Sequence, residues 1–96
     1  MKTIEQKSEE VAELLKFLSH PKRFLLLCKL RDGPKTVGEL EKSCNVSQSQ
    51  LSQFLAAMRE DGILHADKHG QFVSYSIADP RILELMNEIQ RIFCKE

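Results

Sequence analysis

Apolar residues recur every three or four positions over most of the chain, which is the spacing of one face of an α-helix. The pattern predicts five helices, over residues 3–18, 21–31, 37–43, 47–61 and 80–94. The second segment is apolar around most of its circumference, so we expect it to be the central helix. The first and last segments carry broad apolar stripes, wider than one small core covers.

Capping residues mark where these helices begin. They are Ser19 or His20 before Pro21, Thr36 paired with Glu39, Ser47 paired with Gln50, and Asp79 before Pro80. Between the third and fourth helices stands Asn45, one of the few non-glycine residues that tolerate a positive φ. Two short helices, each with its own cap and joined by a tight turn, make a helix-turn-helix pattern.

The hydrophobic period changes after Gly62. Two strands are predicted, "ILHADK" (63–68) and "FVSYSI" (72–77), and the second places Val73, Tyr75 and Ile77 on one face. Gly70 is free to take a positive φ in the turn between them. The predicted order is therefore α-α-α-α-β-β-α, a mainly α fold with a small β-hairpin. We interpret residues 1–96 as a single winged helix-turn-helix domain.

The fourth predicted helix begins with neutral hydrogen-bonding residues where a surface helix usually carries Lys and Glu. The side chains in question are Gln48, Ser49, Gln50, Ser52 and Gln53. Such groups donate to and accept from base edges when the N-terminal turns of a recognition helix enter the major groove. The hairpin adds Lys68 and His69, which we expect to steady the complex. The alternative interpretation is a capped surface helix that happens to be polar.

Composition neither requires nor excludes nucleic acid. The net charge is zero, which argues weakly against a DNA-binding protein. Residues 20–75 nevertheless carry eight basic and six acidic side chains, so the middle of the chain is slightly basic. No apolar run approaches the roughly 20 residues that span a bilayer, and the N-terminus does not read as a signal peptide. We therefore expect a cytoplasmic protein with no membrane partner.

Three segments together resemble one known family: "LSHPKRFLLLCKL", "TVGELEKSCNVSQSQLSQFLAAMREDGIL" and "GQFVSYSI". They are similar to the ArsR/SmtB family of dimeric winged-helix repressors, over almost the whole chain. The resemblance implies a homodimer built from the first and last helices, a near-palindromic double-stranded operator, and release of DNA on a chemical signal. Phe54 stands where the family usually has His, and Gln50 where it usually has a small residue, so the operator sequence does not carry over.

Many members of that family sense metals, but the familiar ligands are missing here. The thiolate site near the start of the third helix is replaced by Gly38-Glu39-Leu40-Glu41, and residues 79–96 contain no His. The three His, at positions 20, 65 and 69, lack ligand spacing on one face. We predict no metal site and no cofactor.

The chain has three cysteines and no CxxC pair. Cys28 and Cys94 occupy the positions of the two sensor thiols in the persulfide-sensing branch of the family, the SqrR/BigR/HlyU-like repressors. That resemblance implies that reactive sulfur species join the two thiols by a disulfide or polysulfide bridge. Lys29 and Lys95 adjoin them and are expected to favour the thiolate. By position alone, Cys28 is better interpreted as a core residue than as a sensor thiol, and Cys44 is interpreted as packing.

The sequence thus predicts a DNA-binding repressor switched by reactive sulfur or redox chemistry at Cys28 and Cys94. Within the same class, the alternative is a metal-responsive or non-inducible winged-helix regulator. More distant alternatives are a thiol-redox enzyme and a protein-interaction module. Against the enzyme, the chain has no CxxC pair and no His placed by sequence beside Cys28 or Cys94 as a base. We expect the chain not to be an enzyme.

Overall fold

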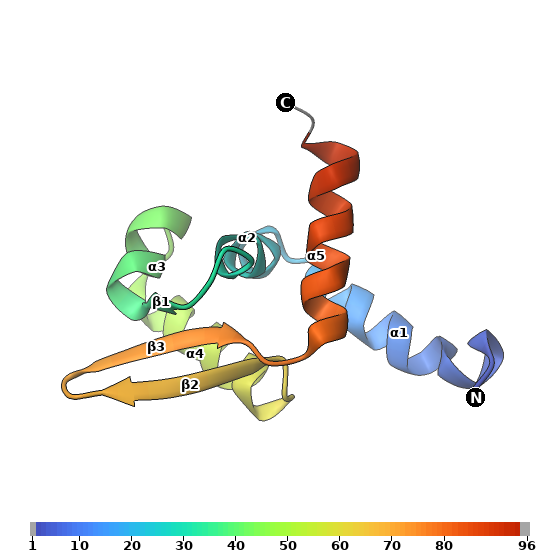
Figure 1. Ribbon diagram of the computed structural model, residues 1–96, viewed down its shortest axis with the longest axis horizontal. Helices are drawn as coiled ribbons and strands as arrows, with labels where there is room; N and C mark the ends of the chain where they lie inside the picture. Colours follow the sequence, from blue (N-terminus) through green and yellow to red (C-terminus); the bar gives the residue numbers. More distant parts are fainter. Residues whose placement is uncertain (1, 95–96) are drawn as a thin grey trace.

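The computed structural model describes residues 2–94 and contains five helices and three strands. In chain order these are α1 (Ile4–Leu18), α2 (Pro21–Leu30), β1 (Lys35–Thr36), α3 (Val37–Cys44), α4 (Gln48–Glu60), β2 (Leu64–His69), β3 (Phe72–Ile77) and α5 (Pro80–Phe93). Every predicted helix boundary lies within one residue of the observed one. The helices α3 and α4 form the helix-turn-helix and β2–β3 form the wing, so the predicted winged helix-turn-helix fold is confirmed (Figure 1).

Local hydrogen bonds explain why the helices begin where they do. Thr36 and Glu39 form the predicted capping box, and His20 caps α2 by accepting the Lys22 N–H at its Nδ1 atom. The box predicted at Ser47 is only half formed, because Ser47 accepts the Gln50 N–H without a reciprocal bond. Each cap satisfies an N–H group that the first helical turn leaves unpaired.

The turn between α3 and α4 depends on Asn45. Its φ is 51° and its ψ is 54°, the left-handed conformation that the sequence predicted for this position. Asn adopts that conformation more readily than other residues with a Cβ atom. The turn is therefore tight, and it fixes the angle at which α4 leaves α3.

The core is a single cluster centred on α2, as predicted. Its buried members come from every helix, from β2 and from the connection between α4 and β2: Leu18, Leu26, Leu27, Leu30, Leu40, Cys44, Leu51, Leu55, Met58, Ile63, Leu64, Ile82 and Met86. No polar or charged side chain within the described residues is buried with them. The α2 helix contacts both α3 and α5.

The sheet has one more strand than predicted. Its order is β1-β3-β2, and β1 pairs antiparallel with β3 through Lys35 opposite Tyr75 and Thr36 opposite Ser74. A two-residue strand is too short to show a period of two, and its partner lies 40 residues away in sequence. In the wing itself, Gly70 takes a φ of 61° at the first of two loop positions, as a type II′ turn requires.

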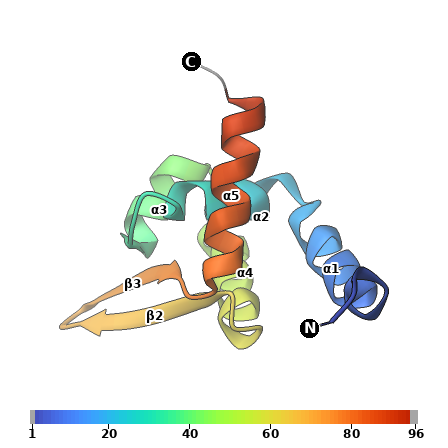
Figure 2. The ribbon, with the colours of Figure 1, turned by 45° about the vertical axis from the view of Figure 1, so that its right-hand side comes forward.

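The α1 helix and the wing project from opposite sides of the core, while α5 stands upright between them (Figures 1 and 2). Both α1 and α5 leave part of their apolar stripes in solvent. The exposed members are Ile4, Val11, Leu15, Leu83, Ile92 and Phe93. Among the described residues, none of the helices has the combined length and apolar character needed to cross a bilayer.

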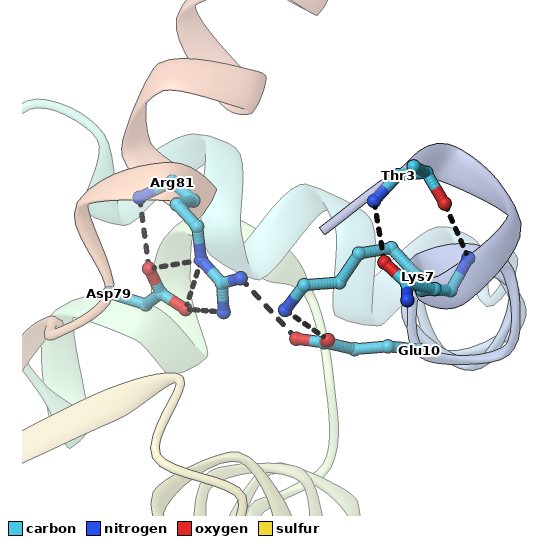
Figure 3. Close-up of polar contacts among 6 residues, drawn as sticks. Thr3, Lys7, Glu10, Asp79 and Arg81 are labelled. Atoms are coloured by element: carbon cyan, nitrogen blue, oxygen red, sulfur yellow. Dashed lines mark hydrogen bonds and ion pairs between the residues drawn. The ribbon is translucent and has the colours of Figure 1, made fainter. Parts of the chain in front are cut away.

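One arginine connects the start of α5 to α1 (Figure 3). The Arg81 guanidinium lies 2.8 Å from an Asp79 carboxylate oxygen and 3.3 Å from a Glu10 carboxylate oxygen on α1. Glu10 in turn pairs with Lys7 at 2.8 Å. The hydrogen bonds from Arg81 lower the pKa of Asp79 below its ordinary value. Since most of these side chains are well exposed, the network contributes little stability.

Candidate DNA interface and thiol pair

The first turns of α4 present the polar side chains that the sequence assigned to DNA reading. The opposite face of the helix is buried through Leu51, Leu55 and Met58, and this burial fixes how the helix is rotated. Four of the five assigned side chains are exposed, namely Gln48, Ser49, Ser52 and Gln53. The fifth, Gln50, is half-buried. The arrangement leaves amide and hydroxyl groups free to contact a ligand surface along one side of α4.

Phe54, the departure from the family pattern, has a packing role. It is half-buried against the core, and its ring meets the His20 ring edge to face at a centroid distance of 5.0 Å. The Arg23 guanidinium lies over the Phe17 ring at 4.2 Å and within 5.7 Å of the Phe54 ring. These contacts hold α4 against α2. Phe54 therefore belongs to the support behind the polar face of α4 and not to that face.

The wing carries less free positive charge than the sequence suggested. Lys68 and His69 are both exposed, as a contact with DNA requires. The His69 Nε2 atom, however, lies 3.2 Å from a carboxylate oxygen of Asp67, two residues earlier on the same side of β2. A carboxylate at this point opposes contact with phosphate. Lys68 is therefore the main cationic group of the wing.

The three cysteines occupy different environments, and all are free thiols. Cys44 is 1% exposed within the core, in agreement with its interpretation as packing. Cys28 is half-buried on α2, and Cys94 is exposed at the C-terminal end of α5. Cys28 stands on α2 and Cys94 at the end of α5, and these two helices contact each other. The pairing of the two thiols stays a prediction.

Lys29 favours the Cys28 thiolate, as expected, but its effect is outweighed. Burial raises the pKa of the Cys28 thiol above its ordinary value, and the negative charge of Cys94 raises it further. A hydrogen bond from Gln90 and the positive charges of Arg31 and Lys29 act in the opposite direction but are outweighed. Lys95 lies outside the described residues. Cys28 is consequently a thiol near neutral pH, and only a small fraction of it is ionised at any moment.

Gln90 is a residue that the sequence analysis missed. Its carbonyl oxygen accepts the N–H of Cys94 at 2.8 Å, and its side chain lowers the pKa of Cys28, although burial outweighs this effect. The sequence did offer a signal for Gln90: it stands four residues before Cys94, and residues four apart lie on the same face of a helix. Within residues 2–94, no group of three or more His, Cys, Asp or Glu side chains is placed to hold a metal ion.

Comparison with known proteins identifies the family. The sequence profile described as "Bacterial regulatory protein, arsR family" matches residues 20–66, which span α2 to the start of the wing. The chain is 39% identical to the Biofilm growth-associated repressor (BigR) of Xylella fastidiosa, over 97% of this chain and 82% of that protein. The chain belongs to the ArsR family. Its identity to the transcriptional activator HlyU of Vibrio cholerae is 33%, over 99% of this chain and 88% of that protein.

Solved structures of ArsR-family relatives share the whole fold. The crystal structure of BigR from Xylella fastidiosa matches with a TM-score of 0.88 over 97% of this chain and 95% of that chain. Reduced HlyU from Vibrio cholerae matches with a TM-score of 0.88 over 96% and 97%, at 34% identity. The expected resemblance to BigR-like and HlyU-like proteins is confirmed. Since these relatives are transcriptional regulators, the ArsR-family chain is a DNA-binding regulator and not an enzyme.

Proposed function

We propose that this ArsR-family regulator is a homodimeric repressor that leaves its operator when reactive sulfur species bridge Cys28 and Cys94. The observation that carries the proposal is the position of the two thiols. They are far apart in sequence, yet they stand on two helices that contact each other, and the charge of Cys94 raises the pKa of Cys28. One thiol is half-buried and the other exposed at a helix end, so a small reagent can reach the pair.

Dimerisation through α1 and α5 is supported by apolar surface that a single copy leaves uncovered. Leu15 is 55% exposed on α1, and Ile92 is 47% exposed on α5. A groove of about 880 Å³ between these helices is lined in part by Val11, Leu14 and Leu85. The same helices of a second copy would cover these surfaces and bury the stripes. A stable monomer in sedimentation at micromolar concentration would contradict this arrangement.

A two-fold dimer would set two α4 helices about 34 Å apart, one turn of DNA, on a near-palindromic site. Gln48, Ser49, Ser52 and Gln53 would read base edges, with the half-buried Gln50 at the margin of the contact. Lys68 and His69 of the wing would contact the flanking backbone, without reading sequence.

Bridge formation balances with a persulfide, RSSH, as the sole oxidant. The Cys28 thiolate attacks the outer sulfur of one RSSH, giving a Cys28 persulfide and RS⁻. The Cys28 persulfide, once deprotonated, attacks the inner sulfur of a second RSSH and expels HS⁻. The Cys94 thiolate then attacks the inserted sulfur and expels RS⁻, leaving a trisulfide. Two protein thiols and two RSSH thus give the trisulfide, two RSH and one H₂S.

The bridge would act on DNA binding through α2. It ties the end of α5, which the dimer uses, to the helix that supports α3 and α4 from behind. A shift in the spacing or mobility of the two α4 helices follows. Only about 1.4 kcal/mol of lost operator affinity corresponds to tenfold weaker binding.

The test combines mass spectrometry with operator binding by fluorescence anisotropy. Persulfide treatment is expected to add sulfur between Cys28 and Cys94, to leave Cys44 free, and to weaken binding at least tenfold. Cys28→Ser and Cys94→Ser are expected to bind DNA normally and to ignore the reagent, whereas Cys44→Ser responds like the unaltered chain. A full response of Cys94→Ser, with none from Cys44→Ser, would show that the pair was misassigned.

Parallel peroxide and metal treatments distinguish the proposed repressor from a metal-responsive or non-inducible regulator.

The dependence of DNA affinity on salt concentration distinguishes it from a protein-interaction module. DNA contacts release counterions, so operator affinity is expected to fall linearly with the logarithm of salt concentration. An interaction module would bind the duplex weakly and with no such slope.

A further inference from the structure

The first turn of α2 carries a cation that no carboxylate neutralises. The Arg23 side chain is half-buried, and its Nε atom is buried without a hydrogen-bond partner. Within residues 2–94, its guanidinium makes no ion pair. Withdrawing a charge from water and leaving a buried donor unpaired both lower stability. An apolar side chain at this position would avoid both costs, so the guanidinium requires another explanation.

Two aromatic rings take the place of the missing carboxylate. The Arg23 guanidinium lies 4.2 Å from the centre of the Phe17 ring on α1 and 5.7 Å from the centre of the Phe54 ring on α4. Both distances lie within about 6 Å, the reach of a cation–π contact. A planar guanidinium also stacks on a ring face, which the compact ammonium of a lysine does not. Arg23 therefore joins a ring of α1 to a ring of α4.

This contact matters because α1 and α4 have little other connection. Within residues 2–94, the main backbone contact of α1 is with α2, whereas the main backbone contacts of α4 are with α3 and β2. Side chains make the connection from α2 to α4. They are Arg23 and His20, whose ring lies 5.0 Å from that of Phe54. The orientation of α4 relative to α1 thus depends on this small cluster.

The neighbouring lysine attaches the other helix of the helix-turn-helix. The Lys22 Nζ atom donates a hydrogen bond to the Cys44 carbonyl oxygen at 3.2 Å, at the end of α3 and directly before the turn at Asn45. A cation at the C-terminus of a helix also interacts favourably with the helix dipole. The first turn of α2 therefore contacts both α3 and α4.

We propose that Arg23 is a positioning residue for DNA reading, whose guanidinium, between the Phe17 and Phe54 rings, sets the orientation of α4 relative to α1. The inference rests on the proposed reading of DNA by α4 and is independent of the thiol pair. In the proposed homodimer α1 belongs to the interface, so this orientation decides how the two α4 helices meet the two half-sites. Binding to random duplex depends mainly on phosphate contacts and needs no such register. Loss of the contact should therefore lower the preference for the operator.

The test removes the plane of the side chain and keeps its charge. Because Arg23→Lys retains the positive charge, its affinity for random duplex in fluorescence anisotropy should stay within about twofold of the unaltered chain. Its operator affinity should fall about fivefold, the factor that one cation–π contact commonly supplies. Arg91→Lys is the matched control, because Arg91 is exposed and pairs with Glu88 of its own helix. Both affinities of the control should equal those of the unaltered chain.

A double-mutant cycle separates positioning from general support of the fold. In a Phe54→Leu background the ring on α4 is absent, so Arg23→Lys should change the ratio of operator to random affinity by less than about twofold. Circular dichroism and sedimentation check the fold and the oligomeric state of each variant. Where a variant does not fold, Arg23→Gln or a Phe54→Met background replaces it. A fivefold loss in both backgrounds, or an unchanged ratio in Arg23→Lys, overturns the proposal.

The failure of this inference and the failure of the proposed function appear in different variants. Gln53→Ala tests whether α4 reads bases, with Arg23 intact. A reduced operator preference in Gln53→Ala with none in Arg23→Lys would leave base reading standing and overturn the role of Arg23. An unchanged preference in Gln53→Ala would instead remove base reading by that side chain. All three cysteines are kept in these variants, so neither result bears on the thiol switch.

Discussion

A bridge between Cys28 and Cys94 should stabilise the folded chain by an amount that the intervening sequence sets. The bridge closes a loop of 67 residues, from position 28 to position 94. Closing a loop of that length lowers the entropy of the unfolded chain, which raises the free energy of unfolding by about 4 kcal/mol at 25 °C. Strain in the folded state subtracts from this value. Because an inserted sulfur lengthens the span, we expect a trisulfide to keep more of the gain than a disulfide.

The assay is urea denaturation of the Cys44→Ser variant, reduced and after persulfide treatment, at one fixed protein concentration. A gain of about 4 kcal/mol moves the midpoint by about 2 M when the m-value is near 2 kcal/mol per M. Peroxide-treated protein is expected to move less. Cys44→Ser/Cys94→Ser, treated in the same way, is the control and should not move, because it has one thiol and no partner within the chain.

Mass spectrometry and non-reducing electrophoresis must accompany the denaturation, since they show whether the bridge lies within one chain. A bridge within one chain that leaves the midpoint unchanged or lowers it would refute the reasoning. The folded state would then hold the thiols too far apart, and the strain of distorting α5 against α2 would cancel the stability gained from loop closure. A bridge between two chains would refute it differently, by placing the reactive pair across the dimer.

Three further changes test other parts of the molecule. In anisotropy titrations, Gln53→Ala should lower the binding free energy for the operator by about 1–3 kcal/mol and reduce the preference for the operator over random duplex. Lys68→Ala should weaken binding to the operator and to random duplex by the same factor. If both variants lost affinity for the two duplexes equally, base reading by α4 would be contradicted. Leu15→Glu, on the exposed stripe of α1, should give a monomer in sedimentation, and Glu9→Lys on the polar side should not. Asp79→Ala should lower the free energy of unfolding by about 1 kcal/mol in urea through loss of the α5 cap. The pKa of Asp79 is lowered in the folded chain, so the stability difference between the unaltered chain and Asp79→Ala should be at its full size at pH values above the ordinary pKa of about 3.9. It should disappear as the pH falls through the folded-state pKa. A stability difference that persists in acid would exclude the carboxylate as its source.

The sequence by itself determined the elements and their order, because the signals for them are local. Helical spacing, Pro21 and Pro80 at helix starts, and Asn45 in the turn act over a few residues, so their consequences are readable without the fold. The polar first turns of α4 could also be predicted locally, since burial of Leu51, Leu55 and Met58 leaves the other side of the helix in solvent. The resemblance to ArsR-family segments then supplied the pairing of Cys28 with Cys94.

Tertiary structure decided what depends on residues far apart in the chain. The strand β1 exists only because Lys35 and Thr36 meet β3, and no local period marks it. The contact of Phe54 with His20 likewise joins residues far apart in the chain. The direction of the Cys28 pKa shows the reason most plainly. Lysine neighbours in sequence suggest a thiolate, but burial against α5 and the charge of Cys94 outweigh them, and both exist only after α5 has packed across α2.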